Sequence, residues 1–260
     1  MKKLVYTITL TSALFLFFSC SKQAQETSDK ALLSQEASID QASFDASKSD
    51  PKAVLLAETV IAAHGGKEAW NKARYISWNF LGSRDLVWDK YTGLVRIDYP
   101  REESTYIINI QEDTGQVMLR NQLIKDPDSL INYIDRGKQI WVNDAYWLVF
   151  PFKLMDPGVE LHYVGSDTTV SGKKAEIIAL SFDEVGFTPE NKYYAYIDPQ
   201  TKLILQWDYF SKATDSLPSL SSEWTEYERY GDLFLSSGRG ARKLGNIAVS
   251  QSIDSTLFIF

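Results

Sequence analysis

The sequence predicts a mainly β fold with inserted helices. We expect a single large antiparallel curved sheet or open half-barrel of about ten strands, with an N-terminal helix and central helices against its concave face. Aromatic residues make up 13% of the chain, including 14 Tyr and 7 Trp, and such residues are enriched in strands. From Arg74 onward the side chains alternate with a period of two between turn-forming residues. So many successive strands are expected to curl or close.

The first residues have the pattern of a secretory leader. Lys2 and Lys3 supply positive charge, and the apolar run to Phe18 is too short and too rich in hydroxyl groups for a transmembrane helix. Leu16–Cys20 resembles a lipobox, with phenylalanine at the position where leucine is commonest. The resemblance implies cleavage before Cys20 and acylation of that cysteine. The alternative is an ordinary secretory signal with a chance cysteine.

Three segments are expected along the chain. Residues 1–19 form the signal peptide, residues 20–50 hold the lipidated Cys20 and a flexible tether, and residues 51–260 form the half-barrel domain. The tether is rich in Ser, Gln, Ala, Lys, Asp and Glu, so it cannot bury enough apolar surface to offset its ordering entropy. A marginal helix over 28–36 is the alternative for part of it.

Charge and metal-ligating residues exclude several classes of function. The formal net charge is −7, and loss of Lys2 and Lys3 with the leader leaves −7 − 2 = −9. An acidic chain repels nucleic acid and gains no electrostatic attraction to anionic lipid. One cysteine permits no internal disulfide and no cysteine-based zinc site, and two histidines, His64 and His162, exclude a histidine-rich metal site. We therefore expect no metal and no cofactor.

The domain is expected to open with a helix. Pro51 follows Asp50 and suits the first helical position, and Gly65-Gly66 ends the helix. His64 with these glycines is interpreted as a helix C-cap with a left-handed glycine, and a functional site there is the alternative. Glu68 near His64 offers a possible acid–base pair, but exposure to solvent is the simpler interpretation.

Strands and further helices follow in a regular order. A first antiparallel meander is predicted over Tyr75–Leu81, Asp85–Asp89, Leu94–Tyr99, Tyr106–Ile110 and Val117–Arg120. A helix begins at Pro127 with Asp126 as its cap, and a second short helix runs from Asn143 to Pro151. Strands then resume, with a hairpin at Asp198-Pro199. They cover Val159–Val164, Ala175–Phe182, Lys192–Ile197, Leu203–Phe210, Glu223–Tyr230 and Ile247–Ser250.

The pattern resembles a family of uncharacterised Bacteroidota lipoproteins. The resemblance spans about residues 51–260 and depends on the leader, Ala63–Gly66 followed by Trp70, the meander, the segment Trp141–Pro151 and the Asp198-Pro199 hairpin. That family is similar in overall pattern to the LolA/LolB-like lipoprotein-carrier group, the periplasmic carrier and its outer-membrane receptor. Such proteins are open β half-barrels whose concave side, partly covered by helices, holds acyl chains. The resemblance assigns no carrier residue to this chain.

Motifs of known chemistry are missing from the sequence. It contains no Gly-x-Ser-x-Gly, P-loop, His-Glu-x-x-His or dinucleotide-binding motif. Ser237–Gly240 is interpreted as a flexible loop. The carboxylate pairs Asp126 with Asp128 and Glu226 with Glu228 are typical of a solvated acidic surface. We therefore expect no enzymatic activity.

The segment Ile140–Met155 is the strongest candidate for a site, since it is rich in large apolar residues and poor in charge. It is either a helix packed into the sheet as core or the lining or lid of an apolar ligand site. In the second case Asn143 and Asp144 mark a polar mouth, although Asn143 alternatively caps a helix. The candidate ligand-binding residues are Trp141, Tyr146, Trp147, Phe150 and Phe152.

These observations predict a membrane-anchored envelope lipoprotein that binds a lipid or acyl chain in the hollow of a half-barrel. No aspartate stands beside Cys20, since Ser21 and Lys22 follow it, which favours the outer membrane by analogy with enterobacterial sorting. The expected partners are the membrane, through the acylated cysteine, and a lipid or lipoprotein acyl chain. The alternative is a structural or interaction lipoprotein with a filled core. An envelope enzyme ranks last.

Overall fold

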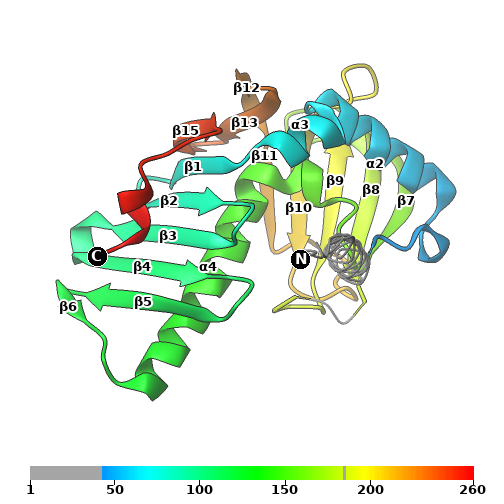
Figure 1. Ribbon diagram of the computed structural model, residues 1–260. Coiled ribbons are helices and arrows are strands. Elements are labelled where there is room, and N and C mark those ends of the chain that lie inside the picture. The colour runs from blue at the N-terminus through cyan, green and yellow to red at the C-terminus, as the bar shows by residue number, and fades with distance from the viewer. Residues whose placement is uncertain (1–42, 184–185) are drawn as a thin grey trace, which may run out of the picture. The chain divides into compact units, whose positions relative to one another are not determined.

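The computed structural model describes residues 43–183 and 186–260 (Figure 1). Cys20, the leader and most of the predicted tether lie outside the described residues. Helices α2 (Pro51–Ala63), α3 (Gly66–Lys72) and α4 (Pro127–Lys153) are accompanied by short 3₁₀ turns η1 (Ala46–Lys48), η2 (Pro100–Glu102) and η3 (Ser255–Phe258). All remaining regular elements of these residues are strands.

The strands of the described residues form three antiparallel sheets. The seven-stranded sheet has the order β15-β1-β2-β3-β4-β5-β6, the five-stranded sheet β11-β10-β9-β8-β7, and the three-stranded sheet β12-β13-β14. The first contains β1 (Tyr75–Phe80), β2 (Arg84–Asp89), β3 (Leu94–Tyr99), β4 (Ser104–Asn109), β5 (Thr114–Leu119), β6 (Gln122–Leu123) and β15 (Gly245–Ser250). The others contain β7 (Val159–Thr168), β8 (Lys174–Phe182), β9 (Lys192–Ile197), β10 (Ile204–Phe210), β11 (Leu220–Glu223), β12 (Thr225–Tyr230), β13 (Leu233–Arg239) and β14 (Arg242–Lys243).

The predicted fold class, mainly antiparallel β with an N-terminal and a central helix and with open sheets, is confirmed. The strands are more numerous than expected and are divided among three sheets. One division falls at Trp224, inside the single strand predicted over Glu223–Tyr230. The Trp224 backbone still donates to Leu205 O at 2.9 Å, but its indole is only 2% exposed, because it packs into the core. Thr225 then pairs with Gly238 of β13, so the chain changes sheets at Trp224.

The helix ends follow the local signals in the sequence. Pro51 is the first residue of α2, and Asp126 caps α4 by accepting from Ser129 N at 2.9 Å. Gly65 ends α2 with φ +121°, and a Cβ at this position would lie 2.5 Å from Asp232 O. Only glycine fits both the backbone angle and this close approach, so the predicted C-cap is confirmed.

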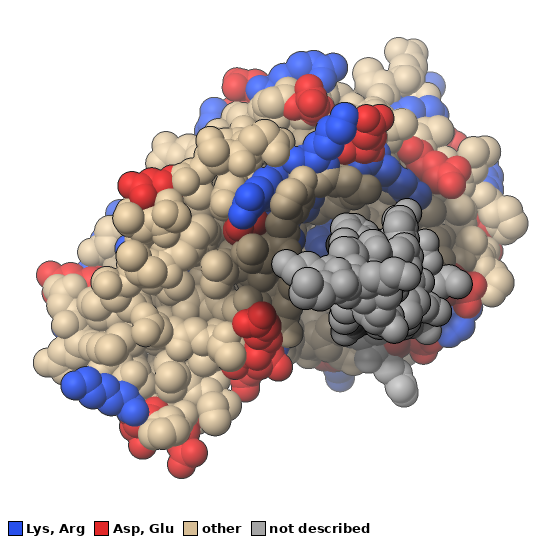
Figure 2. Space-filling view, in the orientation of Figure 1, with Lys and Arg blue, Asp and Glu red and all other residues tan. Residues whose placement is uncertain are grey.

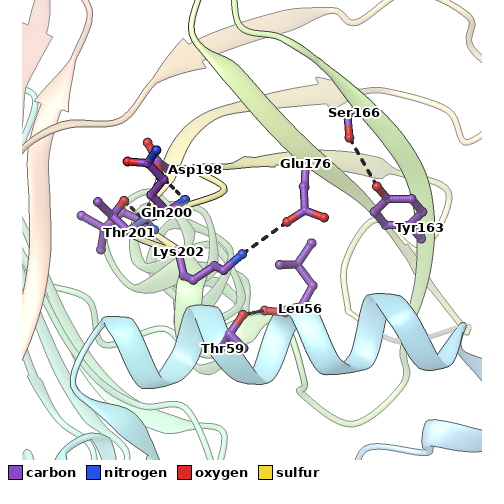
Figure 3. Close-up of polar contacts among 10 residues, drawn as sticks. Leu56, Thr59, Tyr163, Ser166, Glu176, Asp198, Gln200, Thr201 and Lys202 are labelled. Atoms are coloured by element: carbon purple, nitrogen blue, oxygen red, sulfur yellow. Dashed lines mark hydrogen bonds and ion pairs between the residues drawn. The ribbon is translucent and has the colours of Figure 1, made fainter.

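The start of α2 is tied to β7, the edge strand of the five-stranded sheet. Asp50 N donates to Leu161 O at 2.8 Å, and Tyr163 N donates to Asp50 Oδ2 at 2.9 Å. These bonds occupy part of a strand edge that would otherwise remain open to pairing. Figure 3 shows Glu176 and Lys202 on the side of the sheet that α2 covers, joined by an ion pair of 3.3 Å.

The predicted hairpin between β9 and β10 is present. Asp198 Oδ1 accepts from Gln200 N and Thr201 N, both at 2.8 Å, which closes the turn (Figure 3). The two strands pair antiparallel, with Trp207 opposite Ala195 and Tyr209 opposite Tyr193. This register fixes which aromatic side chains share one face of the sheet.

The core lies between the helices and one face of each large sheet. In β1 burial alternates residue by residue, as the period of two predicted. Gly137 of α4 permits close packing on β4, since a Cβ there would lie 3.0 Å from Ile108 Cδ1. The core residues of the seven-stranded sheet include Ile76, Trp78, Phe80, Leu86, Trp88, Val95, Ile97, Tyr106, Ile108 and Val117, and those of the five-stranded sheet include Val159, Leu161, Ile178, Leu180, Ala195, Ile197, Ile204 and Trp207.

His64, the capping residue of α2, is fully buried. Its Nδ1 lies 2.7 Å from Val60 O and its Nε2 lies 3.3 Å from Tyr227 Oη. The Nδ1 atom therefore carries the proton and donates to the carbonyl. Burial lowers the pKa of His64 to about 4, and the bond to Val60 opposes that effect only in part. The imidazole is thus a neutral structural group, and no acid–base pair forms with Glu68, which instead pairs with Lys72.

We predict that His64 makes stability depend on pH. Because the folded pKa of about 4 lies below the unfolded value of 6.5, stability is complete above pH 6.5 and is lost as the pH falls toward 4. Urea unfolding of the wild type and of His64→Gln at pH 7 and pH 4.5 should show about 2–3 kcal/mol more acid-induced loss in the wild type. Equal losses in both proteins would contradict a buried neutral imidazole.

Candidate functional site: an aromatic pocket beside α4

A pocket of about 530 Å³ lies between the second half of α4 and the inner face of the five-stranded sheet. This volume is within the range of small-molecule sites. Aromatic side chains dominate the wall: Trp141, Tyr146, Trp147, Phe182, Phe187, Tyr193, Trp207 and Tyr209. Polar side chains are fewer: Gln139, Asn143, Lys153, Asp156, Thr188 and Asn191.

The structure separates the five predicted ligand-binding residues into two groups. Trp141, Tyr146 and Trp147 line the pocket. Phe150 and Phe152 do not, because Phe150 is fully buried 5.2 Å from the Trp207 ring and Phe152 is buried against Trp70, with ring centroids 4.6 Å apart. The segment thus forms core on one side and pocket wall on the other. Contact of any of these residues with a ligand remains a prediction.

The wall of the pocket opposite α4 was not predicted from the sequence. Tyr193 on β9 and Trp207 and Tyr209 on β10 point to the same face, because alternate residues of a strand share a face and these strands pair in register. The alternation of Trp207 and Tyr209 was visible in the sequence. What it could not reveal was which face of the hairpin α4 covers.

Trp207 is the centre of the aromatic wall. Its ring lies edge-on to Trp147 at 5.0 Å and stacks on Tyr193 at 5.2 Å. Tyr193 in turn lies 5.9 Å from Tyr146. Such pairs each add about 0.5–1.5 kcal/mol beyond area burial, so the wall is held rigidly by several contacts at once.

The inner part of the pocket is uncharged. Burial raises the pKa of Tyr146 and Tyr193 well above the ordinary tyrosine value, so both hydroxyls stay protonated at neutral pH. Lys153 and Asp156 are the charged residues of the lining, and they pair with each other at 2.8 Å. A neutral, aromatic interior with one internally paired charge couple suits an apolar ligand better than an ionic one.

Of the two residues predicted to form a polar mouth, Asn143 and Asp144, only one lines the pocket. Asn143 lines the pocket, but Asp144 is fully buried and points to β2, where Arg84 donates to it through Nε at 2.6 Å and Nη2 at 2.5 Å. Burial raises the pKa of Asp144, and the hydrogen bonds from Arg84 and Asn143 oppose that rise. Asp144 is therefore a structural bridge between α4 and the seven-stranded sheet.

Two further expectations are corrected here. The helix predicted to start at Asn143 is instead the continuation of α4, which runs unbroken in hydrogen-bonded turns until Val149 leaves helical geometry at φ −111° and ψ 17°. Ser237–Gly240 is not a flexible loop, since it contains the end of β13 and the turn to β14, and Ser237 and Arg239 are buried. Serine and glycine concealed this strand because both are poor strand formers in isolation.

The described residues give no sign of a metal site or a spanning helix. Between residues 43 and 260, outside 184–185, no group of three or more His, Cys, Asp or Glu side chains is placed to hold a metal ion. No helix in that part of the chain is long and apolar enough to cross a membrane. On the face shown in Figure 2, acidic and basic side chains are interspersed, and neither forms an extended patch.

Known proteins resemble this chain only weakly. No family model and no curated protein matches the chain. Among solved structures, a DUF1329 family protein from Desulfovibrio piger is 11% identical, with a TM-score of 0.45, over 81% of this chain and 98% of that one. A candidate outer membrane lipoprotein-sorting protein domain from Vibrio parahaemolyticus is 9% identical, with a TM-score of 0.41, over 80% of this chain and 96% of that one. Both scores lie below 0.5, so the fold assignment rests on the elements described above.

We predict that Asp144→Asn lowers the free energy of unfolding by about 3–5 kcal/mol, because it leaves the half-buried Arg84 charge without its partner. Glu68→Gln, which breaks the exposed pair with Lys72, is the matched control and should change stability little. Urea denaturation measures both. An Asp144→Asn protein as stable as the wild type would show that the pair does not bridge α4 and β2.

Proposed function

We propose that the protein is a bacterial envelope lipoprotein that holds one acyl chain, or a similarly elongated apolar group, in the aromatic pocket. The observation that supports this proposal is a hollow of about 530 Å³ with an aromatic wall on both sides, one from α4 and one from the five-stranded sheet. The side chains of the described residues leave this space open to a ligand.

The chemistry of an alkyl chain fits this lining. It needs volume and apolar contact but no hydrogen-bond partner, and each buried methylene contributes about 0.8 kcal/mol. The aromatic walls supply that contact. Asn143, Asn191 and the Lys153–Asp156 pair belong to the same lining and suit the ester or other polar end of the ligand.

The membrane attachment is the second part of the proposal and comes from the sequence. Acylated Cys20, followed by the tether to residue 50, would hold the domain at the outer membrane. Two or more acyl chains are needed for stable attachment, because a single chain binds membranes only marginally. The function requires no cofactor and no catalytic group.

We expect a pocket-filling substitution to weaken ligand binding. The test uses residues 20–260 with Cys20→Ser, here termed the mature soluble chain, titrated with the fluorescent fatty acid cis-parinaric acid. Val142→Trp fills the lining and should weaken binding about tenfold or more, which corresponds to about 1.4 kcal/mol. Ile131→Trp on the exposed side of the same helix is the control and should leave the affinity unchanged.

Native mass spectrometry of the same mature soluble chain adds a probe-free measurement, with a co-purified lipid as the expected result. If the wild type neither carries lipid nor binds the probe, the carrier proposal fails. The interaction lipoprotein with a filled core would then be the better description.

Acylation is tested separately in cells. The full chain, grown with an alkyne-labelled palmitate, should be labelled and recovered in the membrane fraction, while Cys20→Ser should be unlabelled. Ser21→Ala, next to the cysteine, is the control and should keep the label. An unlabelled wild-type protein would contradict the proposed anchor.

A further inference from the structure

The last turn of α4 lacks one of its own hydrogen bonds. Pro151 has no backbone N–H, so it cannot donate to the carbonyl four residues earlier, that of Trp147, and Val149 between them departs from helical geometry. Every residue from Trp147 to Phe152 is buried, so water is a poor substitute. A buried carbonyl left unpaired costs about 1–3 kcal/mol, and such groups are normally satisfied by another donor.

The guanidinium of Arg239, at the end of β13, reaches this carbonyl. Its Nη2 donates to Trp147 O and, at 3.2 Å, to Ser236 O, and its Nη1 donates to Gly238 O at 2.6 Å and to Ser236 Oγ at 2.8 Å. The group also lies 3.7 Å from the centre of the Trp224 ring. Arginine suits this position because its planar fork serves several acceptors at once.

Arg239 is a buried cation with only dipoles and a ring around it. It is 4% exposed, and no ion pair of the described residues includes it. Burial lowers the pKa of Arg239 to about 9, so the side chain stays charged at neutral pH. Burying a charge without a counter-ion is energetically unfavourable. Because Trp147 O is among its acceptors, the retained Arg239 charge indicates a role at the end of α4.

The same contacts lead directly to the pocket. Trp147 lines it and touches Trp207, and the Trp224 ring under the guanidinium lies 6.0 Å from Trp207. Arg239 therefore holds the backbone of one wall residue and the rear of the aromatic cluster that forms the other wall. Arg242, on the same hairpin, faces the Trp147 ring at 5.7 Å but has no described bond to its carbonyl.

We propose that Arg239 is the positioning residue of the pocket: it replaces the donor that Pro151 removes and so fixes Trp147 at the wall. Its effect on ligand affinity rests on the proposed function, whereas its effect on the aromatic cluster does not.

The test is a double-mutant cycle of Arg239→Met and Pro151→Ala in the mature soluble chain. Near-ultraviolet circular dichroism reports the packing of the seven tryptophans, the Trp147–Trp207 pair among them, without any ligand, and cis-parinaric acid reports affinity. Arg239→Met should reduce the tryptophan signal and weaken probe binding about tenfold. Adding Pro151→Ala should restore the signal and bring affinity to within about threefold of the wild type, because this substitution returns a backbone N–H that can donate to Trp147 O.

Lys243→Met, on the same hairpin but exposed and paired with Glu226, is the control and should leave both readouts unchanged. Equal losses from Arg239→Met in the wild-type and Pro151→Ala backgrounds would overturn the proposal, since Arg239 would then stabilise only its own hairpin. If Arg239→Met fails to fold, recovery of folding by Pro151→Ala supports the role and no recovery refutes it. Expected dichroism with no probe binding in any variant, wild type included, would uphold the positioning role and refute the proposed function.

Discussion

The last carbonyls of a buried helix need hydrogen-bond donors from other parts of the protein, and the packing at the centre of the molecule depends on this requirement. In α4 the requirement is sharper than usual, because Pro151 removes a donor that the helix itself would have supplied. The answer comes from a strand 92 residues away in sequence, through Arg239. One contact thereby joins the central helix to the three-stranded sheet.

Helix α4 serves core and pocket together because its faces differ. Gly137 lets it lie close against β4, Asp144 ties it to β2 through Arg84, and Phe150 fills the space under the five-stranded sheet. Trp141, Tyr146 and Trp147 remain at the pocket wall. The core interpretation of this aromatic segment therefore holds for Phe150 and Phe152, and contact with a ligand remains a prediction for the residues at the pocket wall.

Local signals in the sequence were sufficient for much of the fold. Pro51, the glycine at 65, Asp126 before a proline, and the Asp198 turn act within a few residues of themselves, and each lies where it was expected. The long-range features were not accessible in this way. Asp144 was assigned to a pocket mouth from its place in the aromatic segment, since nothing local indicates its partner Arg84, 60 residues distant. The strand ending at Arg239 was concealed by its small residues.

For the pocket as well, only the local part could be predicted from the sequence. The α4 wall was predictable because its aromatic residues are consecutive, whereas Tyr193 and Trp207 become one surface only through strand pairing.

Indole N–H signals in ¹⁵N-tryptophan NMR spectra of the mature soluble chain, titrated with oleate, test the central claim most directly. The account predicts that the signals of Trp141, Trp147 and Trp207, which line the pocket, shift with one common affinity, while that of Trp78, buried in the seven-stranded sheet, stays in place. No shift at any concentration below oleate micelle formation, or a shift of Trp78 as large as that of Trp207, would contradict it.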